Sequence, residues 1–129
     1  MPVIEVNGAK VYIEDTGAPP GRPGAPAIVF GHGLLFSGRM YAAQVARLKD
    51  RYRCVTIDWR GQGKSPASPS DAHMDTLFDD AVAIIEGLNA GPVHYVGLSM
   101  GGFVGIRLAA RRPELLRSLS LLDTSSGPE

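Results

Sequence analysis

The chain has 129 residues, of which 44% are hydrophobic and 20% are charged, a composition typical of one soluble globular domain. Thirteen basic residues balance thirteen acidic ones, so we expect no nucleic-acid partner and no binding to an anionic membrane. The single cysteine, Cys54, cannot form an internal disulfide, and no signal-peptide or membrane-spanning pattern is apparent, so the sequence favours a cytoplasmic protein.

The apolar pattern predicts a hairpin followed by alternating strands and helices. Asn7-Gly8 is a strong hairpin turn signal, and the proline- and glycine-rich segment 18–26 indicates a loop. The later elements follow from apolar runs or from helical spacing of apolar residues. In chain order we expect a strand at 27–30, a helix near 39–49, a strand at 53–59, a helix at 75–89, a strand at 93–98, a helix at 100–111 and a strand at 116–123.

The strands after the hairpin are apolar without alternation, as expected when helices cover both faces of a sheet. Their order predicts an α/β three-layer domain with a mostly parallel sheet. Residues 1–129 are expected to form this single domain, because the chain is too short for two domains of ordinary size.

Ser99 lies in the pattern Gly97-Leu98-Ser99-Met100-Gly101, at the predicted junction of a strand and a helix. Active sites of parallel sheets lie at the carboxyl ends of the strands. A tight turn there has no room for side chains two residues before and after the serine, which explains the glycines. The following helix would direct N–H groups at a developing oxyanion. We expect Ser99 to be a nucleophile; the alternative is a serine N-cap beside glycines that permit close packing.

Three segments resemble the α/β-hydrolase superfamily across essentially all of the chain. GLSMGG is similar to its nucleophile elbow, FGHGLL to its oxyanion loop, and DWRGQGKS to the Asp-x-Arg-Gly-x-Gly-x-Ser loop of its lactonase, esterase and haloperoxidase-like branch. The resemblance implies a six-stranded sheet in the order 1-2-4-3-5-6, with the second strand antiparallel to the rest. It also implies hydrolysis of a small-molecule carboxylic ester or lactone by Ser99, without a cofactor or metal.

The same resemblance implies roles for other residues. The backbone N–H groups of Leu34 and Met100 would form the oxyanion hole, and His32 would shape the oxyanion loop. The residues with structural roles in the loops would be Gly33, Asp58, Arg60, Gly61, Gly63, Gly97 and Gly101.

The segment 58–65 also nearly matches the phosphate-binding P-loop, G-x-x-x-x-G-K-[ST]. Asp58 stands where the first glycine should be, and a carboxylate there would repel phosphate. A P-loop must also run into a helix, whereas Pro66 drives Ser65 from helical geometry. Nucleotide binding is therefore a remote alternative.

No histidine follows Ser99, although this fold places its triad in the order serine, acid, histidine. His94 would lie about 16 Å away along its strand, and His73 lies in a Pro/Ser-rich loop. His32 is the remaining candidate for a surrogate base. Asp123 is a candidate acid, although ordinary loop chemistry also explains an aspartate there. We therefore expect the N-terminal half of a hydrolase core, without its cap and C-terminal strands, that is weak or inactive alone.

The last predicted strand carries no charge over its segment 118–123 until the final aspartate. In the complete fold it would pair on both sides, so an unpaired side would be a template for another chain. We expect a homo-oligomer through this strand or a complementing C-terminal half. The alternative to an enzyme is a non-catalytic minimal, ancestral or split half-domain that self-associates.

Overall fold

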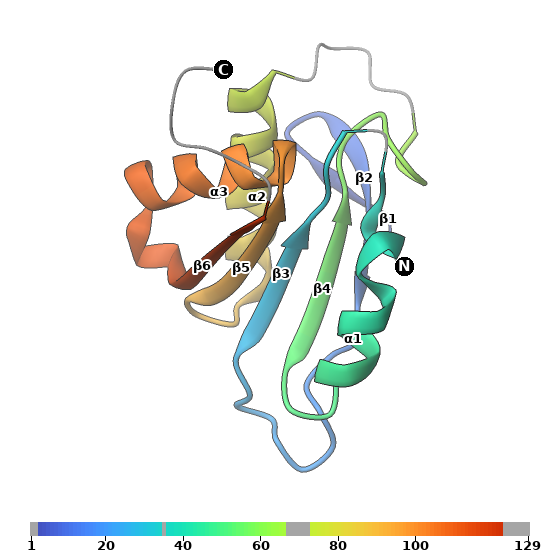
Figure 1. The fold of residues 1–129 in the computed structure, drawn as a ribbon, viewed down its shortest axis with the longest axis vertical. Coiled ribbons are helices and arrows are strands. Elements are labelled where there is room, and N and C mark those ends of the chain that lie inside the picture. The colour runs from blue at the N-terminus through green and yellow to red at the C-terminus, as the bar shows by residue number, and fades with distance from the viewer. Residues whose placement is uncertain (1–2, 35, 67–72, 123–129) are drawn as a thin grey trace.

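The computed structural model describes residues 3–34, 36–66 and 73–122, and these form one six-stranded sheet with helices on its two faces (Figure 1). In chain order the elements are β1 (Val3–Val6), β2 (Ala9–Asp15), β3 (Ala27–Gly31), the 3₁₀ helix η1 (Gly38–Tyr41), α1 (Ala42–Leu48), β4 (Arg53–Asp58), α2 (Met74–Leu88), β5 (Val93–Leu98), α3 (Met100–Arg111), the 3₁₀ helix η2 (Pro113–Leu115) and β6 (Leu116–Leu122).

The strands follow one another across the sheet as β1-β2-β4-β3-β5-β6, which confirms the predicted order. Strand β2 runs antiparallel to both of its neighbours, β1 and β4. Strand β3 pairs in parallel with β4 and β5, and β5 pairs in parallel with β6. The carboxyl ends of β3, β4 and β5 therefore meet at one edge of the sheet, and Ser99 directly follows β5.

The opening hairpin turns where the sequence predicts. Asn7 and Gly8 both have positive φ, 47° and 81°, as a two-residue type I′ turn requires. Val6 and Ala9 are the last pair of the ladder beside this turn.

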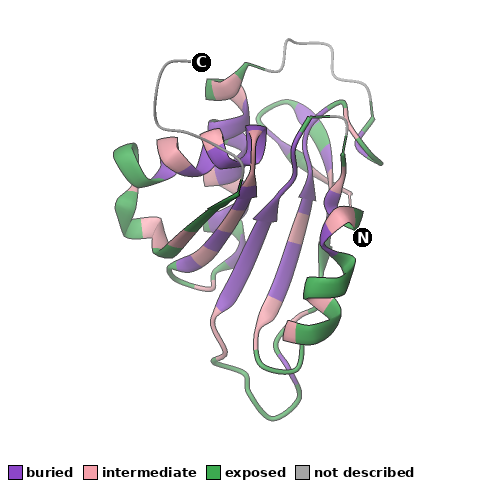
Figure 2. Ribbon diagram, in the orientation of Figure 1, coloured by how far each residue is buried: buried purple, intermediate pink, exposed green. Residues whose placement is uncertain are grey.

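The hydrophobic core has two parts, one on each face of the sheet. Helices α2 and α3 cover one face, where Leu77, Ile84 and Leu108 pack against strand residues such as Val29 and Val55. On the other face, Tyr41 packs with Ile28, Phe30 and Cys54, next to α1. Figure 2 shows β3 and β4 almost wholly buried at the centre and β6 largely exposed at one edge. This arrangement confirms the three-layer prediction.

The predicted helix near 39–49 begins instead as a 3₁₀ turn, and only residues 42–48 are α-helical. Two hydrogen bonds hold this start, one local and one distant in sequence: the Ser37 hydroxyl accepts the N–H of Arg39, and the Asp58 carboxylate accepts the N–H of Gly38 at 2.7 Å. The other two helices match the predicted ranges closely. Asn89 ends α2 in the left-handed region at φ 52°. Among the described residues, no helix is both long and apolar enough to cross a membrane.

Candidate active site

Ser99 occupies a strained turn between β5 and α3. Its φ is 50° and its ψ is −109°, a conformation that costs a non-glycine residue about 1–3 kcal/mol. The turn is held on both sides: the Ser99 N–H donates to the Leu122 carbonyl at 2.9 Å, and the Ser99 carbonyl accepts the N–H of Phe103 at 2.9 Å. Such strain persists only where the surrounding structure imposes it, and it is concentrated at functional sites.

Backbone packing leaves no room for a side chain at either glycine of the motif, Gly97 or Gly101. A Cβ atom on Gly97 would lie 2.7 Å from the Gly102 nitrogen, inside the turn itself. A Cβ atom on Gly101 would lie 2.5 Å from the Gly31 carbonyl carbon and 2.9 Å from the His32 oxygen. The first turn of α3 thus packs directly against the end of β3, without intervening side chains.

Two buried tyrosines fix this packing. The Tyr95 hydroxyl donates to the Gly101 carbonyl at 2.7 Å, and the Tyr41 hydroxyl donates to the Gly31 carbonyl at 2.8 Å. Burial raises the pKa of Tyr41 to about 12 and raises the pKa of Tyr95 well above its ordinary value. Both groups therefore remain protonated donors. Sequence reasoning missed them, although a tyrosine in an otherwise apolar buried strand is a signal that a hydroxyl needs a partner.

His32 is fully buried, and both of its ring nitrogens are in hydrogen bonds. Its Nε2 accepts the backbone N–H of Trp59 at 3.0 Å, so Nδ1 carries the proton and donates to the Gly33 carbonyl at 2.7 Å. The Trp59 indole N–H donates back to the His32 carbonyl at 2.9 Å. Burial lowers the pKa of His32, which favours this neutral form. These hydrogen bonds join the loops after β3 and β4. Because the Nε2 lone pair already accepts a hydrogen bond, the geometry argues against His32 as the surrogate base.

The Asp58 carboxylate organises the loop after β4. One oxygen accepts the N–H of Gly38 at 2.7 Å, and the other accepts the N–H of Lys64 at 2.8 Å. The Ser65 hydroxyl donates to the Asp58 carbonyl at 2.5 Å and accepts the N–H of Tyr12 at 2.8 Å. Gly63 has φ 53°, which favours glycine. Residues 60–65 form turns and bends, and no helix begins at Lys64, which argues against the P-loop alternative.

Arg60 and Asp80 form a buried ion pair, with side chains 3% and 1% exposed. The guanidinium Nε and one terminal nitrogen each donate to a carboxylate oxygen at 2.8 Å. Asn7 Nδ2 donates to the same carboxylate at 3.2 Å. The pair therefore joins the hairpin turn, the loop after β4 and helix α2. Gly61, with φ 72°, directly follows Arg60 in this loop.

The proposed oxyanion loop lies beside the elbow, because β3 and β5 are neighbours with Gly31 opposite Gly97. A Cβ atom on Gly33 would lie 3.4 Å from the Leu98 carbonyl oxygen, which places the two turns in contact. Leu34 is 61% exposed, so the loop faces outward at this edge. Met100, the first residue of α3, directly follows Ser99.

The other candidates from the sequence have different surroundings. The ring nitrogen Nδ1 of His94 lies 2.7 Å from the Ser118 hydroxyl, and His94 pairs opposite Ile28 near the start of β3, away from the carboxyl edge. His73 precedes α2. Asp123 lies outside the described residues.

Comparison with known proteins supports the resemblance to the α/β hydrolases. The sequence model of the alpha/beta hydrolase fold matches residues 26–129. A putative carbamate hydrolase, RutD, from Pseudomonas syringae is 36% identical over 105 residues. That alignment covers 81% of this chain and 40% of the relative. The 3-oxoadipate enol-lactonase 1 of Acinetobacter baylyi is 41% identical over 95 residues, which cover 70% of this chain and 35% of that one.

Solved structures agree with the fold. The enol-lactonase from Burkholderia xenovorans LB400 superimposes with a TM-score of 0.87 at 32% sequence identity, covering 96% of this chain and 47% of that chain. A thermophilic esterase from Thermogutta terrifontis has a TM-score of 0.84 at 30% identity and covers 100% of this chain and 46% of its own. The chain thus spans less than half the length of these relatives. Its sequence match, strand order and strained serine elbow together show that the chain belongs to the alpha/beta hydrolase fold family.

Proposed function

We propose that Ser99 is the nucleophile of a hydrolase that cleaves a small-molecule carboxylic ester or lactone through an acyl-enzyme. The observation that carries this proposal is the strained Ser99 turn, held by two glycines that no side chain can replace without a clash. Several relatives are named for related chemistry, among them an enol-lactonase and a carbamate hydrolase, which supports this substrate class.

In the proposed reaction the Ser99 oxygen forms a bond to the carbonyl carbon, and the carbonyl electron pair moves to oxygen. The N–H groups of Met100 and Leu34 would stabilise that oxyanion, each donor contributing about 2.7–4 kcal/mol to the transition state in comparable sites. The oxyanion then collapses, the bond between the carbonyl carbon and the leaving oxygen breaks, and that oxygen takes the proton that Ser99 gave up, so the alcohol is released. Water then attacks the acyl-enzyme in the same way, which releases the acid and restores Ser99.

A base must accept the Ser99 proton when the serine attacks, and we propose that the described residues do not supply that base. His32 already uses its Nε2 lone pair to accept the Trp59 N–H, so it serves as a positioning residue. No histidine follows Ser99 in these 129 residues. We therefore expect this chain alone to be weak or inactive, with a histidine supplied by another segment or partner in the active protein. Asp123 remains the proposed acid, with a purely local loop role as its alternative.

Hydrolysis of p-nitrophenyl acetate tests the proposal, because an activated ester needs the least assistance from a base. We expect slow turnover that Ser99→Ala abolishes. Ser118→Ala is the matched control, since it removes a serine hydroxyl that also lies beside a histidine, His94, and should leave the rate unchanged. Equal rates in Ser99→Ala and the parent protein would favour the alternative of a non-catalytic half-domain.

We also propose that β6 is a pairing surface. It ends the sheet, and Leu121 and Leu122 are 40% and 45% exposed. From Ser118 to Leu122 the strand carries no charge to discourage pairing. The two proposed occupants are a second copy of this chain and a segment equivalent to the C-terminal part of the relatives.

A further inference from the structure

A groove of about 450 Å³ lies on the α1 face of the sheet, along β4 and between β2 and α1. We call it the β2–α1 groove. Its lining includes Cys54 and Thr56 of β4, Ala42 and Ala46 of α1, and Tyr12 of β2. Its volume is within the range of about 300–1,000 Å³ that is usual for small-molecule sites. None of the residues assigned to the elbow or the oxyanion hole lines it.

Two alanines of α1, Ala42 and Ala46, leave space on the helix side of the groove. Ala42, Ala46 and Lys49 follow one another at i, i+4 and i+7, so they share one side of α1. Tyr41 and Leu48 pack instead into the core on this face of the sheet. On the groove side, α1 therefore presents methyl groups and leaves an elongated space. This space follows β4 from Cys54 to Asp58, which is about 13 Å at 3.3 Å per residue.

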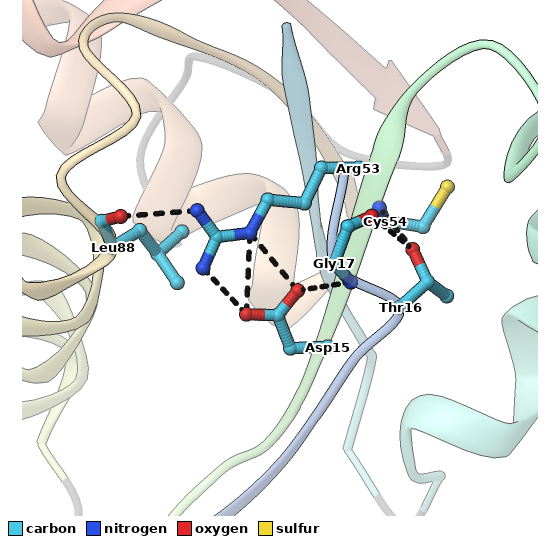
Figure 3. A network of polar contacts seen from close by, with 6 residues as sticks. All are labelled: Asp15, Thr16, Gly17, Arg53, Cys54 and Leu88. Atoms are coloured by element: carbon cyan, nitrogen blue, oxygen red, sulfur yellow. Dashed lines mark hydrogen bonds and ion pairs between the residues drawn. The ribbon is translucent and has the colours of Figure 1, made fainter. Parts of the chain in front are cut away.

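The acidic groups near one end of the groove already have partners. The Asp15 carboxylate accepts two guanidinium nitrogens of Arg53, at 2.6 and 3.0 Å, and the N–H of Gly17 at 2.8 Å (Figure 3). Hydrogen bonding to Arg53 lowers the pKa of Asp15, so it stays ionised within this pair. Glu14, farther along β2, accepts the Tyr12 hydroxyl at 2.7 Å. These contacts satisfy part of the negative charge along the β2 wall.

The basic side chains that line the groove have fewer charged partners than the acidic ones. At the Asp58 end, the Asp58 carboxylate is bound by the N–H groups of Gly38 and Lys64, whereas the Lys64 ammonium lies only over the Tyr12 ring, 5.1 Å from its centroid. Arg39 lines the same end, and Lys49 lines the other. Neither Arg39 nor Lys49 has an ion-pair partner among the described residues. Within the part of the chain that the structure describes, the groove therefore offers two cations without an ion-pair partner, Arg39 and Lys49, and a third, Lys64, whose ammonium lies over an aromatic ring.

We propose that the β2–α1 groove binds a small amphiphilic carboxylate, with its carboxylate at the Arg39 and Lys64 end and its alkyl chain along Ala42 and Ala46. A guanidinium recognises a carboxylate through two parallel hydrogen bonds, which a neutral or cationic head group cannot accept in the same way. The alanine wall and the Cys54 floor bury the chain and contribute about 25 cal/mol per Å² of apolar surface. This proposal does not rest on the Ser99 chemistry.

Titration of the 129-residue protein with octanoate, followed by NMR, tests the proposal. We expect saturable shifts at Ala42, Ala46 and Cys54. Acetate, which lacks the chain, should give no saturable shifts there, and 1-octanol, which lacks the charge, should bind at least about fivefold more weakly. Octanol binding as tightly as octanoate would overturn the proposal, because it would leave no role for the cations.

Two matched pairs of variants locate the ligand. Ala46→Trp should fill the groove and abolish binding, whereas Gln44→Trp, on the opposite side of α1 and outside the groove lining, should not. Arg39→Gln should weaken binding at least about tenfold, because glutamine has no charge and cannot form the two parallel charged hydrogen bonds, whereas Arg47→Gln should leave it unchanged. Octanoate binding that persists undiminished in Ala46→Trp would place the ligand elsewhere and overturn the assignment.

Ser99→Ala separates this proposal from the proposed hydrolysis. We expect the variant to bind octanoate with the affinity of the parent protein, even though it loses esterase activity. A loss of octanoate binding in Ser99→Ala would mean that octanoate occupies the elbow as a reaction product, and the groove assignment would then be wrong.

Discussion

Replacement of Gly101 by alanine tests whether backbone contact between α3 and β3 builds the elbow. Gly101 lies in the first turn of α3, where alanine would ordinarily gain about 1 kcal/mol over glycine in helix propensity. Its new methyl group would meet Gly31 and His32 backbone atoms, at 2.5 Å from a carbonyl carbon and 2.9 Å from an oxygen. Backbone atoms cannot move aside as a flexible side chain can. The loss of stability should therefore lie at the upper end of the range of about 1–3 kcal/mol typical of overpacking, or above it.

Gly87 provides the matched control for this prediction. It also lies within a helix, α2, but a Cβ atom there would meet nothing within 4 Å. Gly87→Ala should therefore stabilise the protein by about 0.5–1 kcal/mol. We expect Gly101→Ala to lose about 2–3 kcal/mol, so the free energies of unfolding of the two variants should differ by about 3 kcal/mol.

Urea denaturation measures this difference directly. With a slope of about 1–3 kcal/mol/M, the two midpoints should be separated by about 1–3 M. A Gly101→Ala protein as stable as Gly87→Ala would refute the close contact between the elbow and β3. Gly101→Ala should also slow ester hydrolysis, because the Ser99 turn and the Met100 N–H move with the helix.

Three further predictions concern stability and assembly. Arg60→Ala should destabilise the protein by about 3–5 kcal/mol, measured by urea denaturation, because it leaves the buried Asp80 carboxylate without its cation; a loss below about 1 kcal/mol would contradict that reasoning. Burial lowers the pKa of His32 in the folded state. The stability that neutral His32 contributes is therefore present above its unfolded-state pKa of about 6.5, and it is lost as the pH falls through its folded-state pKa. His32→Gln should therefore be less stable at pH 7 but lose less stability than the parent between pH 7 and pH 5, and equal slopes would be inconsistent with a buried neutral imidazole. The parent protein should self-associate at high micromolar concentration by light scattering and Leu121→Lys should do so less, whereas a monodisperse parent monomer would count against β6 as a site of self-association.

The order of the elements was predictable because each has a local signal. Asn7-Gly8 allows two positive φ angles, and the apolar runs of β3 and β5 have the length of buried strands. The order of the strands in the sheet came from resemblance to the hydrolase superfamily, since local patterns do not specify which strands become neighbours. The 3₁₀ start of the helix after β3 was missed because it depends on Asp58, twenty residues away in sequence.

The candidate site was predictable at Ser99 and its glycines, where one short segment contains the whole turn. The bond between the His32 ring and the backbone of Trp59 was not, because Trp59 lies in the loop after β4, 27 residues away in sequence. Tyr41 and Tyr95 were missed for the same reason: their hydroxyls reach carbonyls that only the fold brings near. The β2–α1 groove likewise depends on which side of α1 carries its alanines in space.

Covalent labelling of Ser99 tests the central claim most directly. A fluorophosphonate reacts with an exposed serine oxygen beside an oxyanion hole, slowly where no base assists the serine, so a long incubation is used and intact-mass and peptide analysis then locate the adduct. The account predicts one adduct per chain, on the peptide that contains Ser99, absent in Ser99→Ala, retained in Ser118→Ala and lost when urea unfolds the protein. A folded protein that acquires no adduct, or one that is labelled equally in Ser99→Ala, would contradict the assignment of Ser99 as the nucleophile.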